Sequence, residues 1–263
     1  MPSSSSDPDP VVLIHGAWAG SWVWERIMPF LADAGLSAHA VDLPGNGTDS
    51  INPAHVKFED YLDCLDKWTG NLTSPVSLVA HSGGGVSATA FAERWPDRVS
   101  RIVYIAGMML PSDGSFVDLT KTVMQTHPEA SGINPHTIWS SDRSVTYVPV
   151  EAAIVHFFND CSEQDARAAA SRLTPQGEGG RAVVVRTSAE RFGRVPRLYV
   201  EALNDRSVIL PAQRLMQTLV PGARVISLPT GHAPQFSAPR QLAEAIIPFL
   251  RAPAPMPRSS SGA

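Results

Sequence analysis

Short runs of β-branched and apolar residues alternate with segments of helical periodicity from residue 11 onward. Alternation of this kind is typical of a parallel sheet whose strands are joined by crossover helices. Several runs are apolar throughout, as in strands that helices cover on both faces. The sequence therefore predicts an α/β fold with a mostly parallel, six-stranded sheet and flanking helices. The predicted strands are 11–14, 37–41, 76–80, 99–105, 197–201 and 223–228.

Two apolar stripes at helical spacing predict helices that pack on this sheet. Hydrophobic residues make up 43% of the 263 residues, which is enough apolar material for one large core. The stripes consist of Tyr61, Leu62, Leu65 and Trp68, and of Leu242, Ile246, Ile247 and Leu250.

One interval interrupts the alternation. About ninety residues separate the fourth predicted strand from the fifth, whereas a standard crossover takes roughly 10 to 30. We therefore expect a cap at 111–195, inserted into an α/β core formed by 11–110 and 196–250. The cap is predicted to be mainly helical, with helices at 116–127 and 162–173 and an extended stretch at 144–150.

Charge and composition limit the partners of the chain. Its 21 basic and 25 acidic residues give a net charge of −4, so we expect no nucleic-acid partner. No stretch approaches about 18 uninterrupted apolar residues, and the start lacks a basic, apolar leader. We therefore expect no membrane partner and a cytoplasmic location, with a homodimer as one option for the assembly. The Pro- and Ser-rich tails 1–10 and 251–263 are predicted to be disordered.

The cysteines and most histidines give no sign of a metal site. Cys64 and Cys161 lie far apart and match no metal-ligand spacing. We therefore expect neither a metal nor another cofactor. Neither the H-E-x-x-H pattern nor paired-ligand spacing occurs among His39, His55, His127, His136 and His156.

The run VSLVAHSGGGVS, residues 76–87, carries the strongest sign of chemistry. It predicts a buried strand that runs into a Gly-rich turn and then a helix. A nucleophile in such an elbow has a strained backbone and needs small residues two positions before and after it. Ser82 has Ala80 and Gly84 at those positions. A Gly-rich phosphate turn is the alternative, but neither G-x-x-x-x-G-K-[ST] nor G-x-G-x-x-G follows the first strand.

A serine hydroxyl becomes a nucleophile when a base, itself oriented by a carboxylate, takes its proton. His232 follows the last predicted strand and Asp205 follows the strand before it, so both lie at the sheet edge where ligands bind. The order Ser82, Asp205, His232 is typical of a nucleophile elbow. A helix cap is the alternative role for Asp205, with Glu201 as the reserve acid.

Acyl transfer also needs hydrogen-bond donors aimed at the oxyanion. The backbone amides of Gly83, directly after Ser82, and of Ala17, after the first strand, fit this requirement. His15 and His81 are predicted to be structural histidines. Large apolar side chains of this loop and of the cap are core residues by default, but together they would line a pocket for a hydrophobic substrate. They are Trp18, Phe116, Met124, Trp139, Phe157 and Phe158.

With these motifs the chain resembles the α/β-hydrolases, and within them the group that contains plant methylesterases and hydroxynitrile lyases. The resemblance is carried by VVLIHGAW at 11–18 and AHSGGG at 80–85. The run 196–249, from PRLYVEA through SLPTGHAP, is similar to bacterial pyrethroid-hydrolysing carboxylesterases. The resemblance implies an α/β-hydrolase fold. It also implies Ser82 as nucleophile, His232 as base, Asp205 as acid, and the amides of Ala17 and Gly83 as the oxyanion hole.

Two departures from the lyases bear on the reaction. The lyases have a Thr just after the first-strand His and a Lys just after the catalytic His, where this chain has Gly16 and Ala233. A leaving cyanide would therefore have no cationic partner. The sequence predicts a serine carboxylesterase whose small-molecule substrate is a hydrophobic carboxylic ester, and the resemblance implies a pyrethroid-like one. A hydroxynitrile lyase and a non-catalytic small-molecule binder of the same fold are the alternatives.

Overall fold

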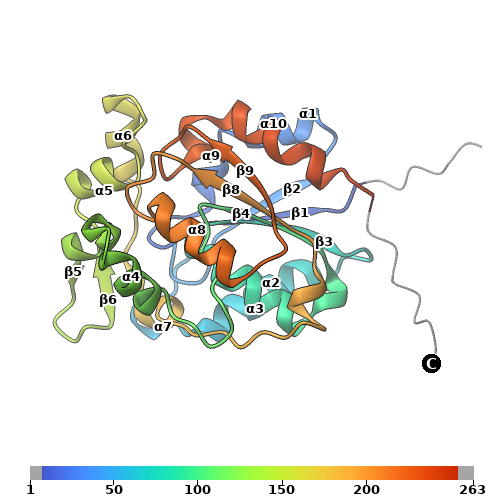
Figure 1. Ribbon diagram of the computed structural model, residues 1–263, viewed down its shortest axis with the longest axis horizontal. Coiled ribbons are helices and arrows are strands. Elements are labelled where there is room, and N and C mark those ends of the chain that lie inside the picture. Colours follow the sequence, from blue (N-terminus) through green and yellow to red (C-terminus); the bar gives the residue numbers. More distant parts are fainter. Residues whose placement is uncertain (1–7, 254–263) are drawn as a thin grey trace, which may run out of the picture.

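Six strands form one sheet in the order β2-β1-β3-β4-β8-β9, and every neighbouring pair is parallel. The structure is a computed structural model that describes residues 8–253. Figure 1 shows the twisted sheet at the centre of the molecule with helices on both sides. The predicted fold class is confirmed. The strands are β1 Val11–Ile14, β2 Ala38–Val41, β3 Val76–His81, β4 Val99–Ile105, β8 Arg197–Ala202 and β9 Arg224–Leu228.

Helices cover the two faces of the sheet with separate hydrophobic clusters. The helices α2, α3 and α8 pack on one face, and α1 and α10 pack on the other. Successive β1 residues point to opposite clusters, since Val12 joins the first and Leu13 the second. This two-sided burial explains why the inner strand β1 is apolar throughout, whereas the edge strands β2 and β9 are partly exposed. The helices are α1 Met28–Asp33, α2 Phe58–Gly70, α3 Gly84–Arg94, α8 Leu210–Leu219, α9 Pro234–Ser237 and α10 Pro239–Leu250, with 3-10 turns η1 Ser21–Trp24, η2 Pro53–His55 and η3 Pro96–Arg98.

Trp68 departs from the predicted apolar stripe of α2. Tyr61, Leu62 and Leu65 are buried, whereas Trp68 is 46% exposed. Its ring centroid lies 5.8 Å from that of His39 on the edge strand β2. The helix therefore passes the edge of the sheet at this turn, and Trp68 covers that edge from outside.

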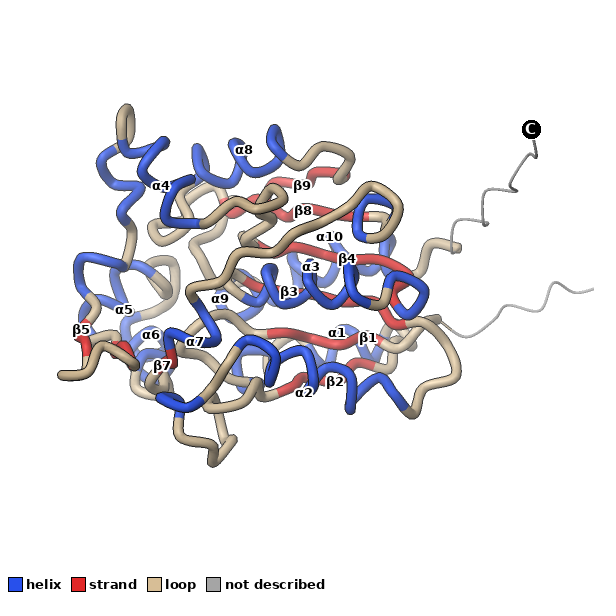
Figure 2. Tube along the Cα trace, turned by 90° about the horizontal axis from the view of Figure 1, so that it is seen from below, coloured by secondary structure: helices blue, strands red, loops and turns tan. Residues whose placement is uncertain are grey.

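Most of the residues between β4 and β8, with α4 to α7, gather at one end of the sheet (Figures 1 and 2). The last part of this stretch runs back along the sheet to the C-terminal end of α3, where Ser188 and Arg191 donate hydrogen bonds to Glu93. We call residues 111–195 the insertion. Its helices α4 and α6 lie within the two stretches predicted to be helical. The strand β6 lies within the stretch predicted to be extended, and α5 starts at the last residue of that stretch, Val150. The pairing of β6 with β5 and β7 in a short antiparallel sheet was not predicted. The elements are α4 Phe116–Met124, η4 Pro128–Ser131, η5 Asn134–His136, β5 Ile138–Trp139, β6 Val145–Tyr147, α5 Val150–His156, α6 Glu163–Ala170, β7 Gln176–Gly177, α7 Glu178–Arg181 and η6 Phe192–Arg194.

The ends of the described chain lie beside the sheet. The Pro10 carbonyl accepts a hydrogen bond from the amide of Ser77, and Arg101 donates to the Ala252 carbonyl at 2.7 Å. Of the tails predicted to be disordered, residues 1–7 and 254–263 lie outside the described residues. No helix among residues 8–253 is long and apolar enough to cross a membrane.

Candidate active site

Ser82 occupies a sharp turn between β3 and α3. Its φ of +50° is uncommon for a residue other than glycine. Three backbone bonds hold this conformation: the Ser82 amide donates to the Ile105 carbonyl, and the Ser82 carbonyl accepts from the amides of Gly85 and Met108. A Cβ on Gly84 would lie 2.5 Å from the His15 carbonyl oxygen. Glycine at this position therefore lets α3 start directly against the end of β1.

The structure brings Ser82, His232 and Asp205 together at the carboxyl ends of β3, β9 and β8. His232 Nε2 lies 3.1 Å from Ser82 Oγ, and His232 Nδ1 lies 2.7 Å from Asp205 Oδ2. All three side chains are buried. With the Nδ1 proton donated to the carboxylate, Nε2 is left to accept the proton of the serine hydroxyl. The arrangement is that of a base oriented by an acid and directed at a nucleophile.

The carboxylate of Asp205 is held from its other side. Its Oδ1 accepts hydrogen bonds from the amides of Ser207 at 2.7 Å and Val208 at 2.9 Å. The reserve acid Glu201 is engaged elsewhere, because its carboxylate accepts from Ser227 Oγ at 2.6 Å and from Arg214 Nε at 3.2 Å. The histidine therefore faces Asp205 and not Glu201.

Two further residues, His81 and Asp160, hold the loop that carries His232. His81 Nε2 donates to the His232 carbonyl oxygen at 2.8 Å. Burial, together with the charge that His232 would carry, lowers the pKa of His81 well below 6.5, so its ring is neutral. From the insertion, Asp160 Oδ2 accepts from the Gly231 amide at 2.6 Å and from Ser237 Oγ at 2.8 Å. The histidine loop is thus braced by β3 on one side and by the insertion on the other.

The predicted oxyanion donors lie beside each other next to Ser82. A Cβ built on Gly83 would lie 3.6 Å from the Ala17 amide nitrogen. Within residues 8–253, neither the Ala17 nor the Gly83 amide has a protein acceptor. A Cβ on Gly16 would lie 2.8 Å from Ser82 Cβ, so the loop passes over Ser82 only because residue 16 has no side chain.

His15 fixes the start of this loop. Its Nδ1 donates to the Gly16 carbonyl at 2.7 Å, and its Nε2 accepts from the Leu43 amide at 3.0 Å. Burial lowers the pKa of His15, which agrees with a neutral ring that donates on one side and accepts on the other. Both His15 and His81 thus have the backbone contacts expected of structural histidines.

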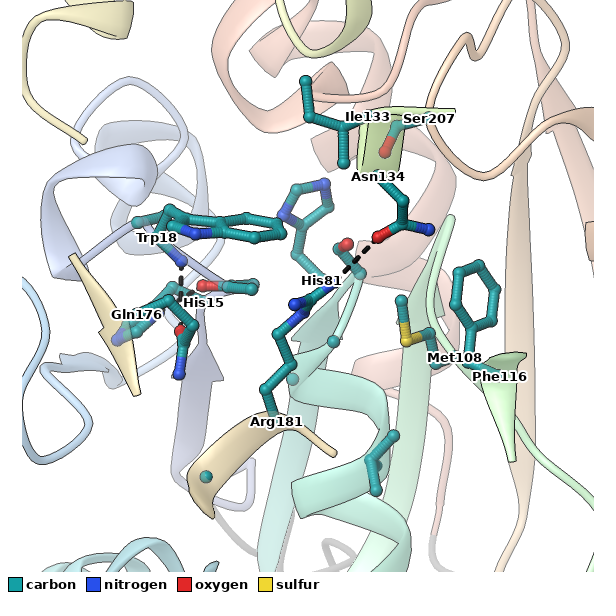
Figure 3. Close-up of a pocket in the computed structure, with 18 of the residues that line it drawn as sticks. His15, Trp18, His81, Met108, Phe116, Ile133, Asn134, Gln176, Arg181 and Ser207 are labelled. Carbon is teal, nitrogen blue, oxygen red and sulfur yellow. Dashed lines mark hydrogen bonds between the residues drawn. The ribbon is translucent and has the colours of Figure 1, made fainter. Parts of the chain in front are cut away.

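A cavity of about 540 Å³ opens beside Ser82 and His232, and the six predicted pocket residues all line it. Trp18, Phe157 and Phe158 are buried, with the Phe157 ring centroid 5.4 Å from that of His232. Met124 and Trp139 are 40% and 38% exposed and form part of the outer wall. Phe116 lies beside Met108 in Figure 3.

Several polar side chains of the cavity were not predicted. Arg181 lies 4.6 Å over the Trp18 ring and donates to Asn134 Oδ1 and Glu178 Oε1, both at 2.7 Å. Gln176 bonds to the Trp18 amide, as Figure 3 shows. These residues belong to the insertion, whose sequence carries no motif for them. Among residues 8–253, no group of three or more His, Cys, Asp or Glu side chains is placed to hold a metal ion.

Comparison with known proteins gives the family. The model for the alpha/beta hydrolase family matches residues 11–245. The chain belongs to this family. The resemblance drawn from its motifs is thereby confirmed.

Relatives of this α/β-hydrolase match it over nearly their whole length. It is 29% identical to the pyrethroid hydrolase of Sphingobium wenxiniae, over 93% of this chain and 88% of that protein. It is 30% identical to methylesterase 7 of Arabidopsis thaliana, over 90% of this chain and 94% of that protein. The crystal structure of a pyrethroid hydrolase from Sphingobium faniae superimposes with a TM-score of 0.81 at 26% identity, covering 94% and 98% of the two chains.

Proposed function

We propose that this α/β-hydrolase is a serine carboxylesterase whose catalytic triad is Ser82, His232 and Asp205. The observation that carries the proposal is the continuous pair of hydrogen bonds from Asp205 through His232 to Ser82, facing a cavity. The relatives named as a pyrethroid hydrolase and a methylesterase support ester hydrolysis as the reaction.

The geometry supports a two-step acyl transfer. Ser82 Oγ adds to the ester carbonyl carbon as its proton passes to His232 Nε2, and Asp205 stabilises the resulting imidazolium. The amides of Ala17 and Gly83 bind the oxyanion of the tetrahedral intermediate. His232 then returns its proton to the alkoxide, and the alcohol leaves. Water, activated by His232, releases the acid from Ser82 by the same steps.

The cavity supports an apolar ester as substrate. The buried ring of Phe157 lies beside His232, and Trp18 and Phe158 pack against Phe157. Met108 and Phe116 lie across the cavity from Trp18 (Figure 3). An aromatic or alicyclic ester of the pyrethroid kind fits this chemistry. The loop geometry opposes cyanohydrin cleavage. A side chain at position 16, where the lyases have Thr, would collide with Ser82, and position 233, where they have a positively charged Lys, is Ala.

Hydrolysis of p-nitrophenyl esters and of a pyrethroid by the purified protein tests the proposal. Replacing Ser82→Ala is expected to abolish turnover and labelling by a serine-directed fluorophosphonate. The matched control is Ser77→Ala, which changes a buried serine of β3, the strand that leads to Ser82; its hydroxyl contacts Ser100 and not the cavity. Undiminished turnover by Ser82→Ala would refute the assignment. Cyanide release from mandelonitrile without ester hydrolysis would favour a lyase, and ligand binding without any turnover would favour a binder.

A further inference from the structure

Gln176, in β7 of the insertion, reaches across to the loop that carries the oxyanion donor Ala17. Its Oε1 accepts a hydrogen bond from the Trp18 amide at 3.1 Å, although 158 positions separate the two residues in sequence. The Gln176 side chain is 2% exposed, so water does not compete for this bond. The peptide group that follows Ala17 is thus held by a side chain from outside the α/β core.

The other end of the Gln176 amide fixes which atom faces Trp18. Its Nε2 donates to Tyr61 Oη and to the Gly177 carbonyl oxygen, both at 2.9 Å. Tyr61 in turn donates to Asn46 Oδ1 at 3.1 Å. Both amide hydrogens are therefore used, and the carbonyl oxygen is the atom left for the Trp18 N–H. If the Gln176 amide were rotated by 180°, its NH2 group would face the Trp18 N–H, and neither group could accept a hydrogen bond.

Trp18 needs this support because its backbone is strained. Its φ of +61° lies in the left-handed region, which is rare for a bulky residue. A second bond from the same segment holds it, because the Thr174 amide donates to the Trp18 carbonyl oxygen at 2.8 Å. Residues 174–176 thus form hydrogen bonds with both the N–H and the C=O of Trp18. Without these hydrogen bonds, the backbone at Trp18 would relax from its positive φ toward a more common, negative φ.

We infer that Gln176 is a positioning residue for the oxyanion hole: it holds the Ala17–Trp18 turn so that the Ala17 amide stays directed at the reacting carbonyl oxygen. The inference rests on the proposed esterase function. An oxyanion exists only in the tetrahedral state, so loss of Gln176 affects transition-state binding and leaves ground-state binding of the ester largely intact.

Gln176→Met tests the inference, because Met has a similar shape and lacks the acceptor oxygen. Loss of a whole oxyanion donor lowers kcat roughly 100- to 1000-fold; here the donor stays but loses its support, so we expect about a 10- to 100-fold fall. KM for the p-nitrophenyl ester should change less than about threefold. Affinity for a trifluoromethyl ketone, which adds to Ser82 and places an oxyanion in the hole, should fall by the same factor as kcat.

Two further variants make the result decisive. Gln176→Asn keeps the amide but withdraws it by one carbon–carbon bond, so it should lower kcat and ketone affinity together even if Gln176→Met does not fold. The matched control Gln217→Met removes a glutamine amide that donates to Glu201, remote from the oxyanion loop, and should leave both quantities unchanged.

The outcomes separate this inference from the proposed function. A folded Gln176 variant with wild-type kcat and ketone affinity overturns the positioning role, and so does a variant whose only change is a higher KM. A wild-type protein that neither hydrolyses esters nor binds the ketone overturns the esterase proposal itself.

Discussion

The side chain of Gln213 hydrogen-bonds to the end of β8, where no neighbouring strand residue is available, and to the loop that carries Asp205. We predict that its loss destabilises the fold. The strand β4 ends at Ile105 opposite Val200, so Ala202 has no β4 partner. The carboxamide of Gln213 takes that place: Oε1 accepts from the Ala202 amide at 3.1 Å, and Nε2 donates to the Ala202 carbonyl at 3.1 Å. Nε2 also donates to the Val208 carbonyl at 2.7 Å, which ties the loop of Asp205 to the strand.

Replacing Gln213→Met removes these bonds without opening a large cavity. The Ala202 carbonyl keeps the Asp205 amide as a partner, whereas the Ala202 N–H and the Val208 C=O lose their partners. Gln213 is fully buried, so water does not replace it. An unsatisfied buried group costs about 1 to 3 kcal/mol, which gives about 2 to 6 kcal/mol of lost unfolding free energy for the two.

Urea unfolding followed by fluorescence measures this loss, and a thermal scan should show a fall of at least about 4 °C at about 2 °C per kcal/mol. The half-buried Gln217 on the same helix serves as control, because Gln217→Met leaves Glu201 with its Ser227 and Arg214 partners. The Gln217→Met variant should lose less than about 1 kcal/mol of unfolding free energy. If Gln213→Met is no less stable than Gln217→Met, the bonds of Gln213 to Ala202 and Val208 do not stabilise the fold as we predict.

Two further predictions concern the site. Because His81 stays neutral in the folded state while an unfolded histidine protonates below about pH 6.5, stability is complete above that pH and declines as the pH falls. His81→Gln should therefore flatten the dependence between pH 6.5 and 5 by up to about 1.4 kcal/mol per pH unit; an unchanged slope in urea titrations at several pH values would contradict a neutral His81. Gly84→Ala would force a Cβ to within 2.5 Å of the His15 carbonyl, so it should lower both stability and the rate of fluorophosphonate labelling, and normal values for both would show that the elbow tolerates a side chain.

The α/β core could be predicted closely because its signals are local. The strand β1 is apolar along its whole length, and β4 has a continuous apolar run from Ile102 to Ile105. Both have the predicted ends, and the other strands differ by one residue at one end. The small residues around Ser82 are likewise imposed by the turn itself. These requirements are met by adjacent residues and can therefore be seen in a short stretch of sequence.

The insertion could not be predicted to the same depth because its order comes from distant contacts. The strands β5 and β7 have two residues each, too few to show a period. Gln176 has the partners Trp18 and Tyr61, which lie 158 and 115 positions away, and nothing beside it in sequence indicates either. The exposure of Trp68 has the same origin, since the position of α2 at the sheet edge decides which turn is covered.

The bonds from Asp160 to the histidine loop and from Gln176 to the oxyanion loop bear on how such enzymes are re-engineered. A chimera that exchanges the insertion to admit different esters also exchanges the groups that brace both loops. Altered turnover in such a chimera would then reflect both the fit of the substrate and the lost support of the two loops. Transplants that retain an acidic side chain at 160 and an amide at 176 should separate selectivity from rate.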